Sequence, residues 1–528
     1  MLPSVQTYED MCQAFRWDLP ERCNMAWDAC DKWVEKDPER TAIIDLTGGY
    51  RKDISFAELQ GLSNQLANHL VELGIKPGDR VGVFRPQSVW TAAAHIAVWK
   101  MGAISIPLFT LFGEEALESR LENSGARAIV TDQKHAEKCA PSFDRMEALD
   151  HVLVPETIDF EDIPDEFEAV QTTPETPGLI IYTSGTTGAP KGALHGHRVL
   201  RGHVPGISML QNILPQDDDV FWTPADWAWI GGLMNVLMTG LYFGVPVVAC
   251  RMQKFNADEC QKIVDEAGVR NVFFPPTALR MLKAEGAGIK GLRSVFCGGE
   301  PLGAEMLDWG REALGLTVNE GYGQTECNLI VANSGVLFEP KAGCMGKPVP
   351  GHDVDVIDHK GNRTLEEGDI AVKRGSASMM LEYWNNPEAT RDKFRGDWML
   401  TGDRGIRDDE FIRFIGRDDD VITSAGYRIG PAEIEDCLMK HKAVASVGVV
   451  GKPDQQRTEI VKAYILLRPG INATDTLSAE LKAYVKTRLA AYEYPREIEF
   501  VDELPMTITG KIIRKELKAR AKRELEST

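Results

Sequence analysis

The chain has 528 residues, more than one hydrophobic core usually holds, which predicts at least two domains. Its 59 basic and 79 acidic residues give a formal charge of −20, which argues against nucleic acid or an anionic membrane as the main partner. The hydrophobic content of 43% and the charged content of 26% are typical of a soluble globular protein.

The cysteines and the hydropathy indicate a cytoplasmic protein. The ten cysteines are scattered without a C-x-x-C pair, which is typical of reduced thiols. Residues 1–17 lack the basic start and the continuous apolar region of a secretory signal. The uncharged stretch 227–250 is long enough to span a bilayer, but its four glycines and one proline predict a buried helix at about 230–242 and a buried strand at 246–250.

Strands and helices alternate through the first part of the chain. Ser55 and Glu58 form a capping box before leucines at helical spacing, and Gly74 ends that helix. The next expected elements are a strand at 80–84, a helix at 90–101, a strand at 103–108, a helix at 114–124 and a strand at 128–131. This alternation predicts an α/β domain of parallel sheets covered by helices.

A domain boundary is expected at residue 416, where a short charge-dense link begins. About 110 residues remain after the link, enough for a small α+β domain. The expected segments are a large domain at 1–416, a link at 417–420 and a small domain at 421–528. The basic residues beyond Arg514 are expected to form a solvated helix face.

Residues 178–192 join a short apolar run, which predicts a buried strand, to a loop of hydroxyl groups, glycines and one lysine. Glycines let the backbone approach an anion, and a lysine suits phosphate. The residues of this loop are Thr183, Ser184, Gly185, Thr186, Thr187, Gly188 and Lys191. The spacing differs from that of a P-loop, since Gly192 follows the lysine, yet it predicts a polyphosphate site.

The segment from Tyr182 to Gly192 resembles the phosphate loop of the adenylate-forming superfamily, which comprises acyl-CoA synthetases, adenylation domains and luciferases. Four further motifs follow in the order of that superfamily. They are Gly298-Gly299-Glu300-Pro301, Gly321-Tyr322-Gly323-Gln324-Thr325-Glu326, Thr401-Gly402-Asp403 with Arg417 fourteen residues on, and Gly426-Tyr427-Arg428 with Thr507 to Arg514. The resemblance spans almost the whole chain and implies a large domain with a small, mobile C-terminal domain.

The resemblance implies an ATP site built from these motifs, with the loop 183–191 at the β- and γ-phosphates. Asp403 would accept both ribose hydroxyls, as suits a carboxylate that faces a cis-diol, and Arg417 would also reach the ribose. Thr325 would touch the α-phosphate and, with Glu326, hold Mg²⁺, which prefers oxygen ligands. The other residues implied at the nucleotide are Gly299, Glu300, Pro301, Gly321, Tyr322, Gly323 and Gln324.

Lys511 resembles the adenylation lysine of the superfamily, which contacts the carboxylate and the α-phosphate together. A fixed ammonium there would stabilise the charge that develops when the carboxylate attacks phosphorus. Acylation of this lysine by a lysine acyltransferase would remove that charge. With Glu326 and Thr325, Lys511 makes up the expected catalytic set.

The resemblance implies two steps: a carboxylate and MgATP give an acyl-adenylate and pyrophosphate, and a thiol then gives a thioester and AMP. The small domain would rotate between the steps about the hinge residue Asp419. Coenzyme A is the expected acceptor, because no carrier-protein serine motif or condensation domain follows. The residues expected at coenzyme A are Ala425, Gly426, Tyr427, Arg457, Lys486 and Arg496. Arg428 would meet the phosphates or the carboxylate.

The acid itself stays open. The motifs most resemble medium-chain acyl-CoA synthetases, and Gly323 stands where acetate-specific relatives carry tryptophan, so we expect open space beside it. Trp227 or Trp229 would shape the pocket floor, although core packing is an equal alternative for both. The prediction is an AMP-forming ligase of a short- or medium-chain acid, straight or branched. The alternatives are an aryl acid or the loading of a carrier protein, and homo-oligomers are compatible with the sequence.

Overall fold

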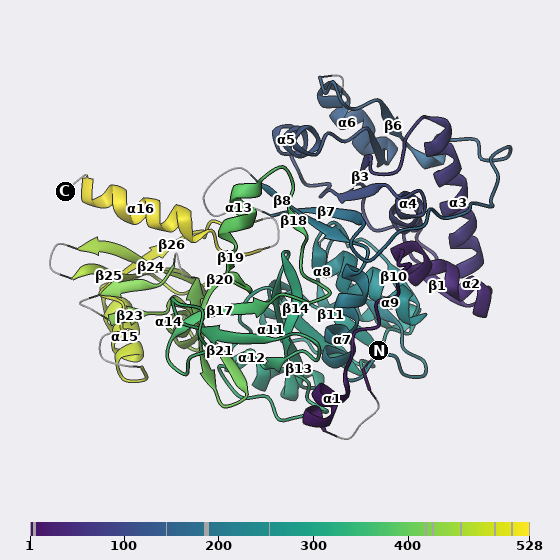
Figure 1. The fold of residues 1–528 in the computed structure, drawn as a ribbon. Coiled ribbons are helices and arrows are strands. Elements are labelled where there is room, and N and C mark those ends of the chain that lie inside the picture. The colour runs from purple at the N-terminus through teal and green to yellow at the C-terminus, as the bar shows by residue number, and fades with distance from the viewer. Residues whose placement is uncertain are drawn as a thin grey trace.

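The structure, a computed structural model, describes residues 2–3, 7–143, 145–183, 190–252, 254–417, 420–424, 427–454, 457–489, 493–507 and 510–526. Within these residues the strands form four sheets. Two large sheets with helices around them come first, a five-stranded sheet follows, and a second five-stranded sheet lies at the C-terminal end (Figure 1). This mixed architecture, with a large N-terminal part and a small α+β part, confirms the predicted fold class.

The seven-stranded sheet has the order β18-β8-β7-β4-β3-β5-β6. Its strands are β3 (Arg80–Phe84), β4 (Ile104–Pro107), β5 (Ala128–Thr131), β6 (His151–Leu153), β7 (Pro177–Thr183), β8 (Lys191–Gly196) and β18 (Glu382–Tyr383). Its helices are α3 (Phe56–Glu72), α4 (Val89–Lys100), α5 (Glu114–Ser124) and α6 (Gln133–Phe143). The expected alternation and the Ser55–Glu58 capping box are confirmed.

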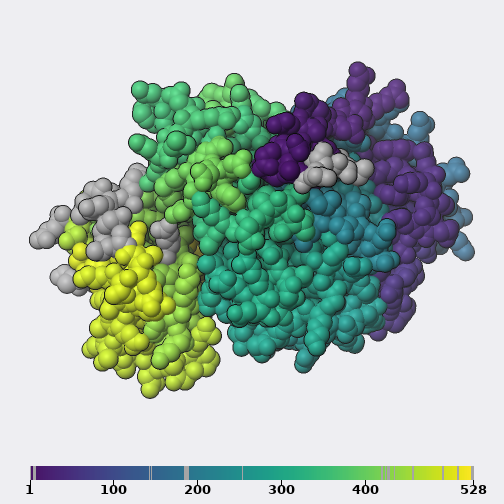
Figure 2. Space-filling model, turned by 90° about the horizontal axis from the view of Figure 1, so that it is seen from below, coloured from purple at the N-terminus to yellow at the C-terminus, as the bar shows by residue number. Residues whose placement is uncertain are grey.

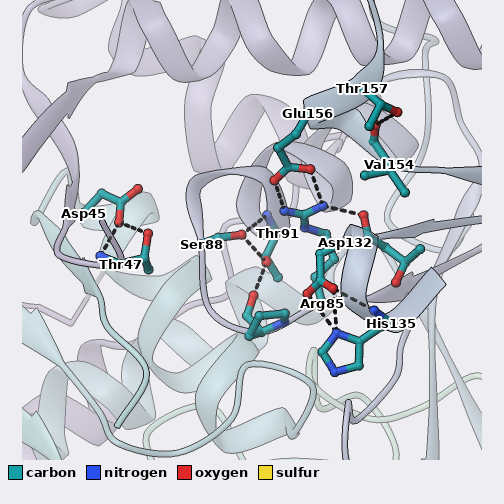
Figure 3. Close-up of polar contacts among 12 residues, drawn as sticks. Asp45, Thr47, Arg85, Ser88, Thr91, Asp132, His135, Val154, Glu156 and Thr157 are labelled. Carbon is teal, nitrogen blue, oxygen red and sulfur yellow. Dashed lines mark hydrogen bonds and ion pairs between the residues drawn. The ribbon is translucent and has the colours of Figure 1, made fainter. Parts of the chain in front are cut away.

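An ion pair between the buried Arg85 and the exposed Glu156 lies at the carboxyl edge of this sheet (Figure 3). Arg85, directly after β3, donates to the carbonyl of Thr131 and to both carboxylate oxygens of Glu156. Asp132 accepts from the backbone N–H of His135 at 2.9 Å. Ser88 caps α4 by accepting from the backbone N–H of Thr91. These contacts satisfy loop groups that would otherwise be buried without partners.

The nine-stranded sheet has the order β15-β14-β13-β12-β11-β9-β10-β1-β2. Its strands are β1 (Thr41–Asp45), β2 (Lys52–Ser55), β9 (Phe221–Trp222), β10 (Val247–Ala249), β11 (Asn271–Phe273), β12 (Ser294–Gly298), β13 (Val318–Gln324), β14 (Cys327–Ala332) and β15 (Lys347–Pro348). Its helices are α7 (Val199–Leu210), α8 (Ile230–Gly232), α9 (Thr239–Phe243), α10 (Ala257–Ala267), α11 (Pro276–Ala284) and α12 (Ala304–Trp309), with π-helical turns η3 (Leu233–Met238) and η4 (Gly310–Leu314).

The uncharged stretch 227–250 folds as predicted, into buried helical turns from Ile230 to Phe243 followed by strand β10. Its side chains join the largest apolar cluster, together with residues of α4 and α7. In the part of the chain that the structure describes, no helix is both long enough and apolar enough to span a bilayer.

The remaining N-terminal elements are α1 (Tyr8–Ala14), the π-helical turn η1 (Trp27–Asp31), α2 (Lys32–Lys36) and the 3-10 turn η2 (Pro155–Thr157). The third sheet contains β16 (Val354–Ile357), β17 (Gly368–Lys373), β19 (Phe394–Arg395), β20 (Trp398–Asp408) and β21 (Phe411–Arg417), and helix α13 (Pro387–Asp392) precedes β19. The sheet links the large sheets to the C-terminal part, because β21 ends at Arg417, shortly before the fourth sheet begins.

The fourth sheet contains β22 (Ile422–Ser424), β23 (Tyr427–Ile429), β24 (Val444–Asp454), β25 (Thr458–Leu467) and β26 (Glu497–Val501). Helices α14 (Pro431–Met439), α15 (Asp475–Lys486) and α16 (Arg514–Glu526) accompany it. These elements have their own apolar core and form a distinct lobe, yellow-green in Figure 2, against the body of the molecule.

The expectation that the basic residues beyond Arg514 form a solvated helix face is confirmed, because Lys515, Arg520, Lys522 and Arg523 of α16 are exposed. Lys518 pairs with Asp420 at 2.9 Å, and Arg520 pairs with Glu499. Glu524 bonds both Lys452 and Lys462, whose ammonium groups hold the pKa of this carboxyl low, at about 2. The helix is therefore attached to its sheet by ion pairs as well as by the buried Leu517.

Candidate active site

Strand pairing brings the motifs to one place. Strands β12 and β13 are parallel neighbours with Gly298 opposite Gly321, so the turns that follow them lie side by side. Strands β7 and β8 form a hairpin in which Thr183 faces Lys191 across the predicted phosphate loop. Ser184, Gly185, Thr186, Thr187 and Gly188 lie outside the described residues. The pairing of Thr183 with Lys191 places the lysine beside the strand that leads into the loop.

Asp403 lies at the centre of a hydrogen-bonded group with two other residues that were predicted at the nucleotide. Tyr322 donates its hydroxyl to Oδ2 of Asp403 at 2.5 Å, and Arg417 donates to Oδ1 at 2.9 Å. Burial raises the pKa of Asp403, while Arg417 acts in the opposite direction. A carboxylate offers about four acceptor positions, so both oxygens retain capacity for a cis-diol.

Glu326 is a buried carboxylate with a tyrosine and a lysine beside it. Tyr383 donates its hydroxyl to Oε1 of Glu326, and Lys393 Nζ lies 4.0 Å from the same oxygen. The Lys191 ammonium lies 5.4 Å from the centroid of the Tyr383 ring. One glutamate oxygen has no protein hydrogen bond among the described residues, as a ligand of a hard cation requires.

Lys393 is a site residue that the sequence does not predict. Its ammonium donates to Oε1 of Gln324 at 2.6 Å and to the carbonyl of Thr401 at 3.4 Å. Gln324 in turn donates to the same carbonyl at 2.9 Å, so its side chain ties two motifs together. Burial lowers the pKa of Lys393, and Glu326 acts in the opposite direction. Lys393 therefore adds a desolvated cation beside the implied phosphate and metal positions.

Lys511 reaches this site from the C-terminal lobe. A Cβ built on Gly299 would lie 3.6 Å from Cε of Lys511 and 3.3 Å from the Trp229 ring. Burial lowers the pKa of Lys511, whereas Glu300 and Asp403 raise it. The lysine and the Trp229 indole thus both lie at the Gly299 turn, close to the residues that the resemblance assigns to ATP.

Contacts between the lobes hold Lys511 in place. Gly510 packs against Thr277 of α11, and Gly303 lies against Asp436 of α14. Within the lobe, Arg514 pairs with Glu435 at 2.5 Å, and burial raises the pKa of that carboxyl while the guanidinium lowers it. The described structure therefore has the lobe closed over the large sheets, with Lys511 at the nucleotide motifs.

The predicted acyl-pocket residues lie in different surroundings. Trp227 is fully buried in the main apolar cluster. Trp229 packs on Phe273 with ring centroids 5.4 Å apart and faces the Gly299 turn. The expectation of open space at Gly323 is wrong, because a Cβ there would lie 2.6 Å from Oδ1 of Asn328. The hairpin of β13 and β14 places this asparagine against the glycine.

Three of the residues predicted at coenzyme A have described side chains, and all three lie on the C-terminal lobe: Arg457, Lys486 and Arg496. Lys486 and Arg496 lie 5.4 Å and 5.1 Å from the centroid of the Tyr494 ring, so two cations share one aromatic side chain. Arg457 donates its backbone N–H to Asp454 at 2.8 Å. Ala425, Gly426 and the hinge residue Asp419 lie outside the described residues, as do the side chains of Tyr427 and Arg428.

The sequence of this chain matches two known protein-family domains and several curated relatives. The AMP-binding enzyme family matches residues 30–384, and the AMP-binding enzyme C-terminal domain matches residues 433–511. Acetyl-coenzyme A synthetase of Bacillus subtilis (strain 168) is 34% identical over 98% of this chain and 95% of its own. The mitochondrial acyl-coenzyme A synthetase ACSM4 of Rattus norvegicus is 36% identical over 95% of this chain and 91% of its own.

Two solved structures are similar over their whole length. The anthranilate CoA ligase AuaEII, solved in complex with anthranoyl-AMP, superposes with a TM-score of 0.88 at 27% identity, covering 96% of this chain and 99% of its own. An acyl-CoA synthetase of Brucella canis superposes with a TM-score of 0.74 at 32% identity, covering 99% and 100%. The chain therefore belongs to the AMP-binding enzyme family of the adenylate-forming superfamily.

Proposed function

We propose that the protein is an AMP-forming acyl-CoA synthetase. The observation that carries this proposal is the position of Lys511, whose side chain from the C-terminal lobe lies against the Gly299 turn in the same site as Asp403 and Arg417. A ligase that adenylates a carboxylate needs this combination of a ribose acceptor, a phosphate loop and a cation at the reacting oxygens. Both curated relatives described above carry the name of coenzyme A synthetases.

The residues present suit a magnesium site. Glu326 has one carboxylate oxygen without a protein hydrogen bond among the described residues, and Thr325 adds a hydroxyl, which with phosphate oxygens is a usual set of Mg²⁺ ligands. Magnesium bound there would neutralise phosphate charge. Tyr383 and Lys393 would keep the carboxylate oriented toward that position.

The protein's own side chains would perform three tasks in the adenylation step. Asp403 and Arg417 would fix the ribose, the loop ending at Lys191 would hold the terminal phosphates, and the Lys511 ammonium would lie between the acid and the α-phosphate. The burial that lowers the pKa of Lys511 also excludes water from its ammonium, which strengthens the attraction of the ammonium to developing charge. Rotation about residues 417–420 would then bring the coenzyme A residues of the lobe to the adenylate.

ATP–pyrophosphate exchange over a panel of short, medium-chain, branched and aryl acids tests this proposal. Exchange with at least one acid, together with acyl-CoA and AMP formation only when coenzyme A is added, is the expected result. Exchange without any coenzyme A thioester would favour loading of a carrier protein. The absence of exchange with every acid would contradict acyl adenylation. We also infer a cytoplasmic location, which the ten free thiols support.

A further inference from the structure

Two asparagines form a buried pair beside the predicted acyl position. Asn328 on β14 donates its Nδ2 to Oδ1 of Asn235 on the π-helical turn η3 at 2.9 Å. Both belong to otherwise apolar segments, and their neighbours Leu233 and Ile330 are fully buried. Burying two amides in such surroundings is costly unless their hydrogen-bonding groups are used.

Each amide leaves one group without a protein partner. Among the described residues, Asn235 Nδ2 and Asn328 Oδ1 form no hydrogen bond, and neither atom is sealed from solvent as fully buried orphan atoms are. The two residues keep 3% and 5% of their surface exposed, so the pair lies at an edge of the core. If the O and N atoms were exchanged in both amides, one donor and one acceptor would still be left without a protein partner.

The pair lies next to the nucleotide motif. Oδ1 of Asn328 is 2.6 Å from the point where a Cβ of Gly323 would be, and Gly323 lies near the end of β13. The neighbouring strand β12 leads into Gly299, which contacts both Trp229 and Lys511. An acid whose carboxylate meets Lys511 would therefore extend its chain past Trp229 toward the two amides. The π-helical turn that carries Asn235 is of a kind often found at functional sites.

We propose that the acid is a hydroxy acid whose hydroxyl group bonds to Asn235 and Asn328. This inference rests on the proposed adenylating function and specifies its substrate class. A single hydroxyl is both a donor and an acceptor, so it satisfies Asn328 Oδ1 and Asn235 Nδ2 together. A keto group satisfies only the donor of Asn235, and an unsubstituted chain satisfies neither. Sites built to bind a substrate hydroxyl discriminate strongly against analogues that lack it.

Pyrophosphate exchange with acids of matched length tests the proposal on the unmodified protein. The pairs are propionate against 2- and 3-hydroxypropionate, and butyrate against 2- and 3-hydroxybutyrate. We expect one hydroxy acid of a set to exceed its unsubstituted partner at least about tenfold in kcat/KM. Equal or higher kcat/KM for both unsubstituted acids would overturn the hydroxy-acid proposal while leaving the adenylating function intact. The absence of exchange with any acid would instead contradict that function.

Variants then locate the recognition. Asn328→Leu keeps the side-chain size and removes both hydrogen-bonding groups, so it should lower kcat/KM more for the hydroxy acid than for the unsubstituted acid and thereby abolish the preference. Asn333→Leu is the matched control, because Asn333 is fully buried and both its amide atoms are sealed from solvent. That control should leave the preference unchanged. A hydroxy-acid preference that survives in both Asn328→Leu and Asn235→Leu would overturn the assignment of the pair.

Discussion

Glu320 should make the stability of the protein fall with rising pH. It lies on β13 directly before the nucleotide motif and is buried, and the one hydrogen bond of its carboxyl within the described residues comes from the Leu302 N–H at 3.3 Å. Burial raises the pKa of Glu320 from 4.5 to about 7, and the charge of Asp436 on the C-terminal lobe adds to this rise.

The size of the effect on the free energy of unfolding follows from the rise in the pKa of Glu320. Below pH 4.5 the carboxyl is protonated in both the folded and the unfolded chain, so it has no effect on the free energy of unfolding. Between pH 4.5 and 7 the unfolded chain ionises while the folded chain keeps its proton, and above pH 7 the loss of stability levels off. A pKa that differs by this amount corresponds to about 3 kcal/mol.

Glu320→Gln removes the titration and keeps the size and the carbonyl acceptor. Relative to the unmodified protein, its free energy of unfolding should therefore rise by about 3 kcal/mol between pH 4.5 and 8. Urea unfolding at several pH values measures this difference, and the same change at the exposed Glu388 serves as the control. A difference between Glu320→Gln and the unmodified protein that stays constant with pH would refute the reasoning.

Three further predictions concern the site. In Lys511→Ala, pyrophosphate exchange should be about 10²- to 10³-fold slower, while a supplied acyl-adenylate should still be converted to acyl-CoA at a near-normal rate. Equal loss in both half-reactions, together with a lower Tm, would indicate a structural role. Because burial lowers the pKa of Lys511, exchange should decline toward alkaline pH before an ordinary lysine titrates, and Lys511→Arg should remove that decline; an identical pH profile would contradict the assignment. Lys393→Met should weaken ATP binding about tenfold in calorimetry without metal, because Gln324 loses its partner and the Glu326 charge faces the phosphates uncompensated. Lys393→Arg should restore part of that affinity, whereas an unchanged Kd in Lys393→Met would show that Lys393 only supports the fold.

The predictable part of the site consists of local runs of residues with one kind of chemistry. A phosphate loop, a ribose carboxylate and a lysine after a glycine each restrict several neighbouring positions, so the sequence carries them as motifs. The structure joins Tyr322 to Asp403, 81 residues away in the sequence, and Asp403 to Arg417, 14 residues away, in one hydrogen-bonded group. The order of the motifs indicates that these residues lie together, although it gives no distances between them.

The residues that the sequence did not predict belong to no sequence motif. Lys393 follows a short helix among other charged residues, and Tyr383 lies on a two-residue strand, so neither position shows a pattern. Their role comes only from the tertiary contacts with Gln324 and Glu326. The open space expected at Gly323 failed for a similar reason, because the turn of the β13–β14 hairpin brings Asn328 back against the glycine.

The asparagine pair nevertheless left a signal in the sequence. Asn235 interrupts the uncharged stretch 227–250, and an amide in a buried helical segment needs a partner that periodicity alone does not supply. Asn328 supplies half of that partner, since each amide uses one group on the other. The remaining donor and acceptor point to a ligand because apolar residues of similar size would fill a purely structural core at lower cost. A buried polar residue in an apolar run therefore deserves a functional hypothesis as much as a glycine-rich loop does.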